Sequence, residues 1–445
     1  MEHLRKIIFG ILLLFGVIPS FAQTDLTNAD SIPVIPTLTD TLSIVDTSML
    51  DTSSLDETDE LEEETHIHWE EDTLYWGHDS ILLVRFYDKL KNLMDTKKGN
   101  LHIVQIGGSH VQAGTMTHCI RKHLLDDFGE PPASRGFIFP YSTASLCNNP
   151  YDYRIVKDQT FNLIRNVYQN HLFPLGASGI AVWNTDGLNS FTVKMNAKDY
   201  DFVADTVILL GQAHGWPIDP ILKEDTIYHF PDSIDYDKGQ YFYCFKQPIK
   251  DFTLYFPCSK GDTFVINGIL LKNGRPGITV SSIGVNGAQT SSYLRCKNFT
   301  RDMNLLHPDL VIFNIGVNDA YGSNFDSVLF KNNYLKLVKQ IREANPECAF
   351  IFVSNNDTWK RARRNRYTVN PTGPAVADVM YRLADLTGSA VWDQFSIMGG
   401  LKSMETWRRK GLAQHDRVHF TAAGYNLIGD LFYNAFIREI KTESE

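Results

Sequence analysis

Positive charge is missing from the first part of this 445-residue chain, because no Lys or Arg occurs between Lys6 and Arg85. Residues 23–71 are instead rich in Thr, Ser, Asp and Glu. A segment of this composition buries too little apolar surface to offset its conformational entropy. We therefore predict a disordered acidic linker over residues 23–72. Residues 24–84 hold 16 acidic and no basic side chains, whereas the chain from Arg85 onward holds 40 basic and 35 acidic residues. The net charge from Arg85 onward is therefore about +5, against −10 for the whole chain.

Long apolar runs are also missing, since none reaches the roughly 18 residues of a membrane-spanning helix. The run at residues 7–17 follows Arg5 and Lys6 and leads to Ser20-Phe21-Ala22, the layout of a cleavable secretory signal. We therefore predict a signal peptide over residues 1–22, a periplasmic or extracellular protein, and no transmembrane segment in the mature chain. Nucleic acid is excluded as a partner, because basic and aromatic residues do not interleave in this exported chain.

Cysteine is sparse and shows no Cys-x-x-Cys pair and no metal-ligand spacing, so we predict no metal site. Export would permit disulfides, and Cys244 with Cys258 could bridge neighbouring strands. In a chain of this size, cysteines serve as often as buried apolar side chains, which is the interpretation we favour. The six cysteines are Cys119, Cys147, Cys244, Cys258, Cys296 and Cys348.

About 370 residues follow the linker. A single hydrophobic core rarely supports a chain of this length, so we expect a main domain with an insertion or a second domain. Most of this part alternates strands and helices, which predicts a parallel sheet with helices on both faces. The expected strands are residues 101–106, 277–283, 309–315, 349–353 and 390–393, and the expected helices are 78–95, a stretch ending near 127, 326–344 and 375–386.

Between residues 151 and 276 the pattern changes to short alternating runs of aromatic and β-branched residues separated by turn formers. These runs predict an inserted all-β, sandwich-like domain. Trp183, Trp216 and Tyr241 are candidates for a sugar-binding face, although core packing is the commoner role for any one such ring. The expected strands are residues 179–184, 190–195, 206–210, 240–246, 251–257 and 263–271.

Asp416 and His419 stand three residues apart just before an apolar, helix-like run. At this spacing a tight turn lets the carboxylate hydrogen-bond one imidazole nitrogen and leaves the other free as a base. Such a base needs a nucleophile, and Ser109 occupies a glycine turn between a predicted strand and helix, where α/β sheets bind ligands. The turn lacks the Gly-x-Ser-x-Gly spacing of an α/β-hydrolase elbow. Polar turns at Gly287 and Asn318 follow two further strands, so all these residues are expected at one sheet edge.

Four short motifs resemble, in chain order, the four blocks of the SGNH (GDSL-type) hydrolases. They are Gly-Gly-Ser-His at Ser109, Gly-Val-Asn-Gly-Ala at Gly287, Gly-Val-Asn-Asp at Asn318, and Asp416-x-x-His419. The resemblance covers roughly residues 101–437 and is closest to bacterial peptidoglycan O-acetylesterase-like members with a β-rich insertion. It implies a flavodoxin-like three-layer α/β/α sandwich, built from residues 73–150 and 277–445 around an inserted β domain at 151–276. It also implies chemistry without a metal or cofactor.

The resemblance assigns Ser109 as nucleophile, His419 as general base and then acid, and Asp416 as the group that orients His419. The backbone N–H groups of Ser109 and Gly287 and the side-chain amide of Asn318 would form the oxyanion hole. The two histidines beside the site are more commonly structural hydrogen-bonding residues than second bases. The candidate substrate contacts are His110, Gln112, Asp319 and His415.

Gly108 departs from the family pattern, which has Asp at this position, and so removes a hydrogen-bond acceptor and adds backbone freedom. Basic residues at 360–366 and 408–410 are expected near the carboxyl edge of the sheet. They would form either a collar for an anionic polymer or a solvated loop, and we favour the loop.

These observations predict an exported serine esterase that removes O-acetyl or other small acyl groups from a polysaccharide, either peptidoglycan, our first expectation, or a plant glycan. One alternative is a catalytically weak or inactive scaffold that binds glycan, which Gly108 and the insertion motivate. The others are an acetylxylan-type esterase and an O-acyltransferase that uses the same three residues.

Overall fold

The computed structural model describes residues 66–144, 150–196, 199–321, 324–362 and 366–441. The predicted signal peptide and most of the predicted linker lie outside the described residues. Residues 66–72 belong to the folded part, because Ile67 is buried and Asp72 accepts a 3.0 Å hydrogen bond from Trp392 Nε1. Folded structure therefore begins before the predicted boundary.

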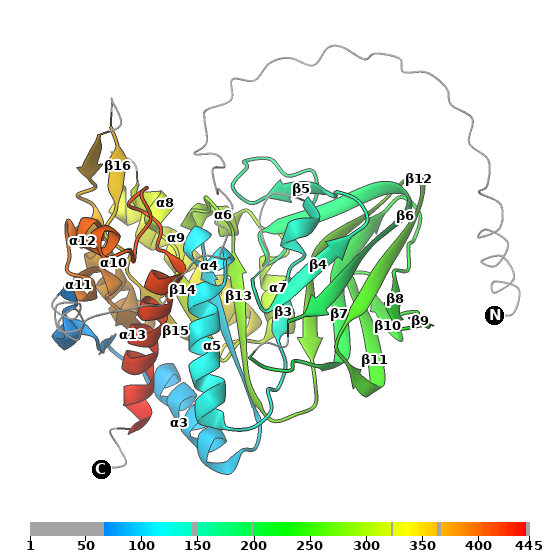
Figure 1. The fold of residues 1–445 in the computed structure, drawn as a ribbon, viewed down its shortest axis with the longest axis horizontal. Helices are drawn as coiled ribbons and strands as arrows, with labels where there is room; N and C mark the ends of the chain where they lie inside the picture. Colours follow the sequence, from blue (N-terminus) through cyan, green and yellow to red (C-terminus); the bar gives the residue numbers. More distant parts are fainter. Residues whose placement is uncertain (1–65, 145–149, 197–198, 322–323, 363–365, 442–445) are drawn as a thin grey trace, which may run out of the picture. The chain divides into compact units, whose positions relative to one another are not determined.

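A six-stranded sheet forms the centre of the α/β part (Figure 1). Five of its strands are parallel, and in chain order they lie 2-1-3-4-5 across the sheet, the flavodoxin-like order. The sixth is a short antiparallel edge strand that the sequence pattern did not predict. This confirms the predicted fold class. The spatial order is β1 (Leu74–Trp76), β18 (Ala390–Trp392), β15 (Ala349–Val353), β14 (Leu310–Asn314), β2 (Asn100–Gly107) and β13 (Gly277–Gly284).

Helices cover both faces of this sheet, because successive strand residues point to opposite sides. In β14, Leu310 and Ile312 pack on one side, and Val311 and Phe313 pack on the other. The first side is covered by α3 (Ile81–Thr96), α5 (Thr115–Phe128) and α13 (Ala422–Lys441), and the second by α7 (Phe299–Leu306), α9 (Ser327–Ala344) and α10 (Gly373–Thr387).

Short elements occupy the connections of the α/β part. They include a hairpin that the sequence did not predict, in which Trp359 pairs with Val369. The short elements are η2 (Trp69–Glu71), α4 (Ser109–Gln112), α6 (Thr290–Leu294), α8 (Val317–Ala320), β16 (Trp359–Arg361), β17 (Tyr367–Val369), α11 (Gln394–Ile397) and α12 (Ser403–Arg409). One further short helix, η3 (Tyr141–Ala144), belongs to the segment between α5 and β13. Among the described helices, none combines the length and apolar character that a membrane span requires.

The segment between α5 and β13 forms a second, ten-stranded antiparallel sheet. Two strands of this sheet, Ile180–Met195 and Phe252–Lys272, are each one long strand where the sequence predicted two shorter ones. The pairing register shifts between Cys258 and Thr263, so the polar residues there mark a bulge within a strand and not its end. The strands are β3 (Gly136–Ile138), β4 (Tyr153–Lys157), β5 (Asn162–Arg165), β6 (Ile180–Met195), β7 (Ala204–His214), β8 (Ile221–Glu224), β9 (Ile227–His229), β10 (Ser233–Asp235), β11 (Gln240–Ile249) and β12 (Phe252–Lys272).

The core of this β part is continuous with the second side of the parallel sheet. Tyr241 is 1% exposed and lies in that core, so its assignment to a sugar-binding face is wrong. Trp183 is half-buried against Phe173, whereas Trp216 is 77% exposed. All five cysteines in the described residues are free thiols, and four of them are buried; the exception is Cys244 on the surface. Cys147 lies outside the described residues.

Candidate active site

Ser109 lies where β2 meets the first turn of α4. The preceding turn is tight, because a β-carbon on Gly107 would lie 2.4 Å from the Asn314 carbonyl oxygen of neighbouring β14. The carbonyl of Gly108 accepts hydrogen bonds from the N–H groups of Val111 and Gln112. As the first residue of the helix, Ser109 has an N–H without an intrahelical acceptor. Its hydroxyl is half-buried just beyond the end of β2, at the carboxyl edge of the sheet.

His419 reaches Ser109 from the loop before α13. Its Nε2 lies 2.8 Å from Ser109 Oγ, and its Nδ1 lies 2.6 Å from Asp416 Oδ2. The other Asp416 oxygen accepts hydrogen bonds from the N–H groups of Val418 and His419, at 2.9 and 3.0 Å. Burial alone would raise the pKa of Asp416, but the hydrogen bonds and positive charge of His419 hold this pKa below its usual value. Asp416 is therefore an ionised acceptor that fixes the plane of the imidazole.

Gly287 and Asn318 lie on the turns after β13 and β14. Gly287 has φ +81°, which only glycine adopts without strain, and its N–H makes no hydrogen bond within the described part of the chain. The Asn318 amide donates one hydrogen to Ala288 O at 3.0 Å and keeps a second for another acceptor. A β-carbon on Gly108 would lie 3.5 Å from Asn318 Nδ2, so this amide is adjacent to the nucleophile turn.

Two of the four candidate substrate contacts hold the turns together. Gln112 is buried and accepts the N–H of Asn286 at 2.7 Å. The Asp319 carboxylate accepts the backbone N–H and the hydroxyl of Thr290, the latter at 2.6 Å, and burial raises the pKa of Asp319 to about 6. Because both side chains are occupied within the protein, we assign them to positioning of the turn that carries Gly287.

The other two candidates are histidines with different surroundings. His110 is buried behind His419, with ring centroids 5.1 Å apart, and its Nδ1 lies 2.9 Å from the Tyr425 hydroxyl. Burial, and then the positive charge of His419, lower the pKa of His110 to about 3, so its ring is neutral and acts as a support. His415 is exposed in the loop that carries His419, and its carbonyl accepts a hydrogen bond from Arg417.

Arg417 is a residue of the site that the sequence analysis missed. Its backbone is left-handed, with φ +57°, and its guanidinium binds Glu405 at 2.7 Å and lies 4.3 Å from the ring centroid of Tyr367. Its carbonyl accepts the N–H of Trp359, so the β16–β17 hairpin holds the His419 loop. Glu405 also pairs with Arg408, which neutralises part of the basic cluster at 408–410. The opposite charges of Glu405 and Arg417 were the available signal, but the packing of Arg417 on Tyr367 has no signal in the local sequence.

The chain is similar to one protein family and to solved structures of esterases. Residues 267–427 match the GDSL-like Lipase/Acylhydrolase family. A structure titled "Peptidoglycan O-acetylesterase in action" is similar to 83% of this chain and 99% of its own, with a TM-score of 0.68 and 22% identity. A family two carbohydrate esterase from Cellvibrio japonicus aligns over 65% of this chain and 98% of its own, at TM-score 0.28 and 9% identity. No curated protein sequence matches the chain.

The chain therefore shares the fold of the first of these solved structures, and its residues 267–427 are similar to the GDSL-like lipases and acylhydrolases. The matched segment starts within β12 and ends in α13, so it includes Gly287, Asn318, Asp416 and His419 but not Ser109. The β part separates Ser109 from the other three blocks in sequence.

Proposed function

We propose that this protein is an exported serine esterase that hydrolyses O-acetyl esters on a polysaccharide, with peptidoglycan as the substrate. The observation that carries the proposal is the hydrogen-bonded series Ser109 Oγ, His419 and Asp416, with distances of 2.8 and 2.6 Å. A serine hydroxyl is a poor nucleophile at neutral pH and requires such a base within contact range.

In the proposed mechanism, Ser109 Oγ attacks the acetyl carbonyl carbon while His419 Nε2 takes the hydroxyl proton. The oxyanion is stabilised by the N–H groups of Ser109 and Gly287 and by the second amide hydrogen of Asn318. His419 then gives its proton to the sugar oxygen, which leaves as an alcohol. Water attacks the acetyl-serine with His419 again as base, acetate departs, and Ser109 regains its proton.

The substrate class rests on two supports. The solved structure titled as a peptidoglycan O-acetylesterase aligns over 83% of this chain, so the shared region must include much of the β part. The sequence of residues 1–22 predicts export, and peptidoglycan lies outside the cytoplasmic membrane. Acetylated plant glycan is the second substrate candidate, which the sequence analysis left open.

The test is acetate release from O-acetylated peptidoglycan and, in parallel, from acetylated xylan. Ser109→Ala should abolish release without lowering the melting temperature, because the hydroxyl is half-buried and bonds only His419 among the described side chains. Ser142→Ala is a matched control in the β part. Equal release by Ser109→Ala would remove this residue from the mechanism. Glycan binding without hydrolysis by the wild type would favour a non-catalytic scaffold, and acetyl transfer to a sugar in preference to water would favour a transferase.

A further inference from the structure

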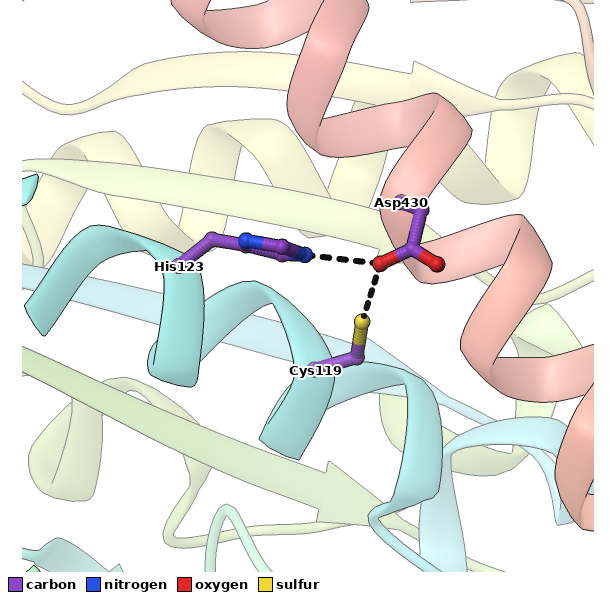
Figure 2. A group of neighbouring side chains, drawn as sticks. All are labelled: Cys119, His123 and Asp430. Atoms are coloured by element: carbon purple, nitrogen blue, oxygen red, sulfur yellow. Dashed lines mark hydrogen bonds and ion pairs between the residues drawn. The ribbon is translucent and has the colours of Figure 1, made fainter. Parts of the chain in front are cut away.

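Three metal-ligating side chains converge outside the hydrogen-bonded series that runs from Ser109 to Asp416. Cys119 and His123 come from α5, and Asp430 comes from α13 (Figure 2). One ligand atom from each lies within 4.8 Å of the other two. The proposed hydrolysis uses none of these three residues.

The two helices are built to bring these atoms together. Cys119 and His123 are four residues apart and so share one face of α5. The helices approach closely at Gly429, where a β-carbon would lie 2.7 Å from Cys119 Cβ. The Tyr433 ring stacks on His123 with centroids 4.7 Å apart and fixes the imidazole plane. The three donors therefore already lie close together.

Both α5 side chains contact the same oxygen of Asp430. Cys119 Sγ lies 3.1 Å from Oδ1, and His123 Nε2 lies 2.7 Å from it. A tetrahedral ion with bonds of about 2.0–2.3 Å would hold its ligand atoms about 3.3–3.5 Å apart. The side chains must therefore separate by about half an ångström. His123 and Asp430 are half-buried and can rotate to allow this shift.

We propose that Cys119, His123 and Asp430 bind one Zn²⁺ ion that links α5 to α13. A thiolate, an imidazole and a carboxylate suit this borderline-soft ion, whereas Mg²⁺ and Ca²⁺ prefer oxygen ligands throughout. A water molecule completes the four-coordinate site. On binding, the Cys119 S–H bond breaks, its proton leaves to solvent and an S–Zn bond forms without a change of oxidation state.

The site would join the two helices that follow the hydrolytic residues. Helix α5 begins six residues after Ser109, and α13 begins three residues after His419. An ion that links them would stabilise the approach of nucleophile and base. The sequence analysis looked for metal ligands close together in sequence and found none. It could not indicate this site, because Asp430 lies 307 residues after His123.

The test uses the purified mature chain without a histidine tag, stripped with a chelator. Zn²⁺ affinity is measured by competition with a chromophoric chelator, and Co²⁺ is added to detect thiolate charge-transfer absorption. We expect one tight Zn²⁺ per chain, a thiolate–Co²⁺ band, and a higher melting temperature with Zn²⁺. Cys119→Ser should lose the band and weaken binding by more than the roughly 100-fold that outer-shell changes cost.

Cys258→Ser is the matched control, because Cys258 is also a buried free thiol but lies in β12. It should keep the affinity and the absorption band. His123→Gln, at a half-buried position, provides a second ligand variant if Cys119→Ser does not fold. Wild-type binding no tighter than that of either ligand variant, or a band that survives in Cys119→Ser, would overturn the proposal. Because these readouts do not involve hydrolysis, they are independent of the proposed function.

Discussion

Asn318 offers a sharp test of the oxyanion hole. Its amide donates to Ala288 O at 3.0 Å, which aims the remaining N–H, and it lies beside the turn of Ser109. Asn318→Ala would leave two backbone donors, those of Ser109 and Gly287. Loss of one preorganised donor typically lowers kcat by about 10² to 10³, or about 2.7–4 kcal/mol of transition-state stabilisation.

The same substitution removes the bond to Ala288, and a lost neutral hydrogen bond costs about 1 kcal/mol of unfolding free energy. The turn should persist, because Asp319 still accepts two hydrogen bonds from Thr290. Thermal unfolding separates this small effect from the catalytic one. Asn318→Asp should be slower still, since a carboxylate cannot donate and would repel both the Ala288 carbonyl and the oxyanion.

The assay is steady-state hydrolysis of p-nitrophenyl acetate and of acetylated glycan. Asn196→Ala is the control, because that amide also donates to a backbone carbonyl, Tyr151 O at 2.8 Å, but does so in the β part. A kcat close to the wild-type value together with a raised KM would refute the reasoning. Asn318 would then bind the substrate ground state and not the transition state.

Three further predictions concern carboxylates. Asp416→Asn should keep the fold but lower kcat for ester hydrolysis by up to about 10⁴-fold, because the amide no longer selects the reactive His419 tautomer. A decrease of less than tenfold would argue against a role of Asp416 in orienting His419. The pKa of Asp319 is about 6 in the folded protein, above its ordinary value of 3.8, so folding favours the protonated side chain. The stability that this preference contributes is full below pH 3.8 and is lost as the pH rises through 6. The difference in unfolding free energy between wild type and Asp319→Asn should fall across this range, and a flat difference would contradict the shift. Asp152→Ala should cost about 3–5 kcal/mol in denaturant unfolding, since it leaves Arg121 and Arg135 buried without their ion pairs; a cost below 1 kcal/mol would show that the cluster relaxes.

The sequence predicted the α/β layers well because the parallel strands are mostly buried runs, continuously apolar in β15 and interrupted by a few polar residues in β2 and β13. Strand β15 was predicted with its observed ends. Strand β1 was missed because three residues carry no periodic signal, and β6 and β12 were divided because polar residues within a strand look like turns.

At the site, the sequence predicted which residues would meet but not what holds them. The blocks around Ser109, Gly287 and Asn318 follow the ends of β2, β13 and β14, so topology brings them to one edge, and the loop before α13 carries His419 to them. Their catalytic roles stay predictions. The supports could not be predicted, because contacts such as Arg417 with Tyr367 depend on tertiary packing of a hairpin that has no local pattern.

The position of the insertion explains how a large β part can be added without disturbing the site. It lies after α5 within the connection between β2 and β13, two strands that pair in parallel from Asn100 with Gly277 to Gly107 with Gly284. This register sets the distance from Ser109 to the Gly287 turn, whatever the length of chain between them. The β part is fixed to the same layer by Asp152, which pairs with Arg121 of α5 at 2.8 Å, while Arg121 also donates to Val280 O of β13. Changes on the exposed surface of the β part can therefore occur while the register of β2 and β13 keeps the Ser109 and Gly287 turns in place.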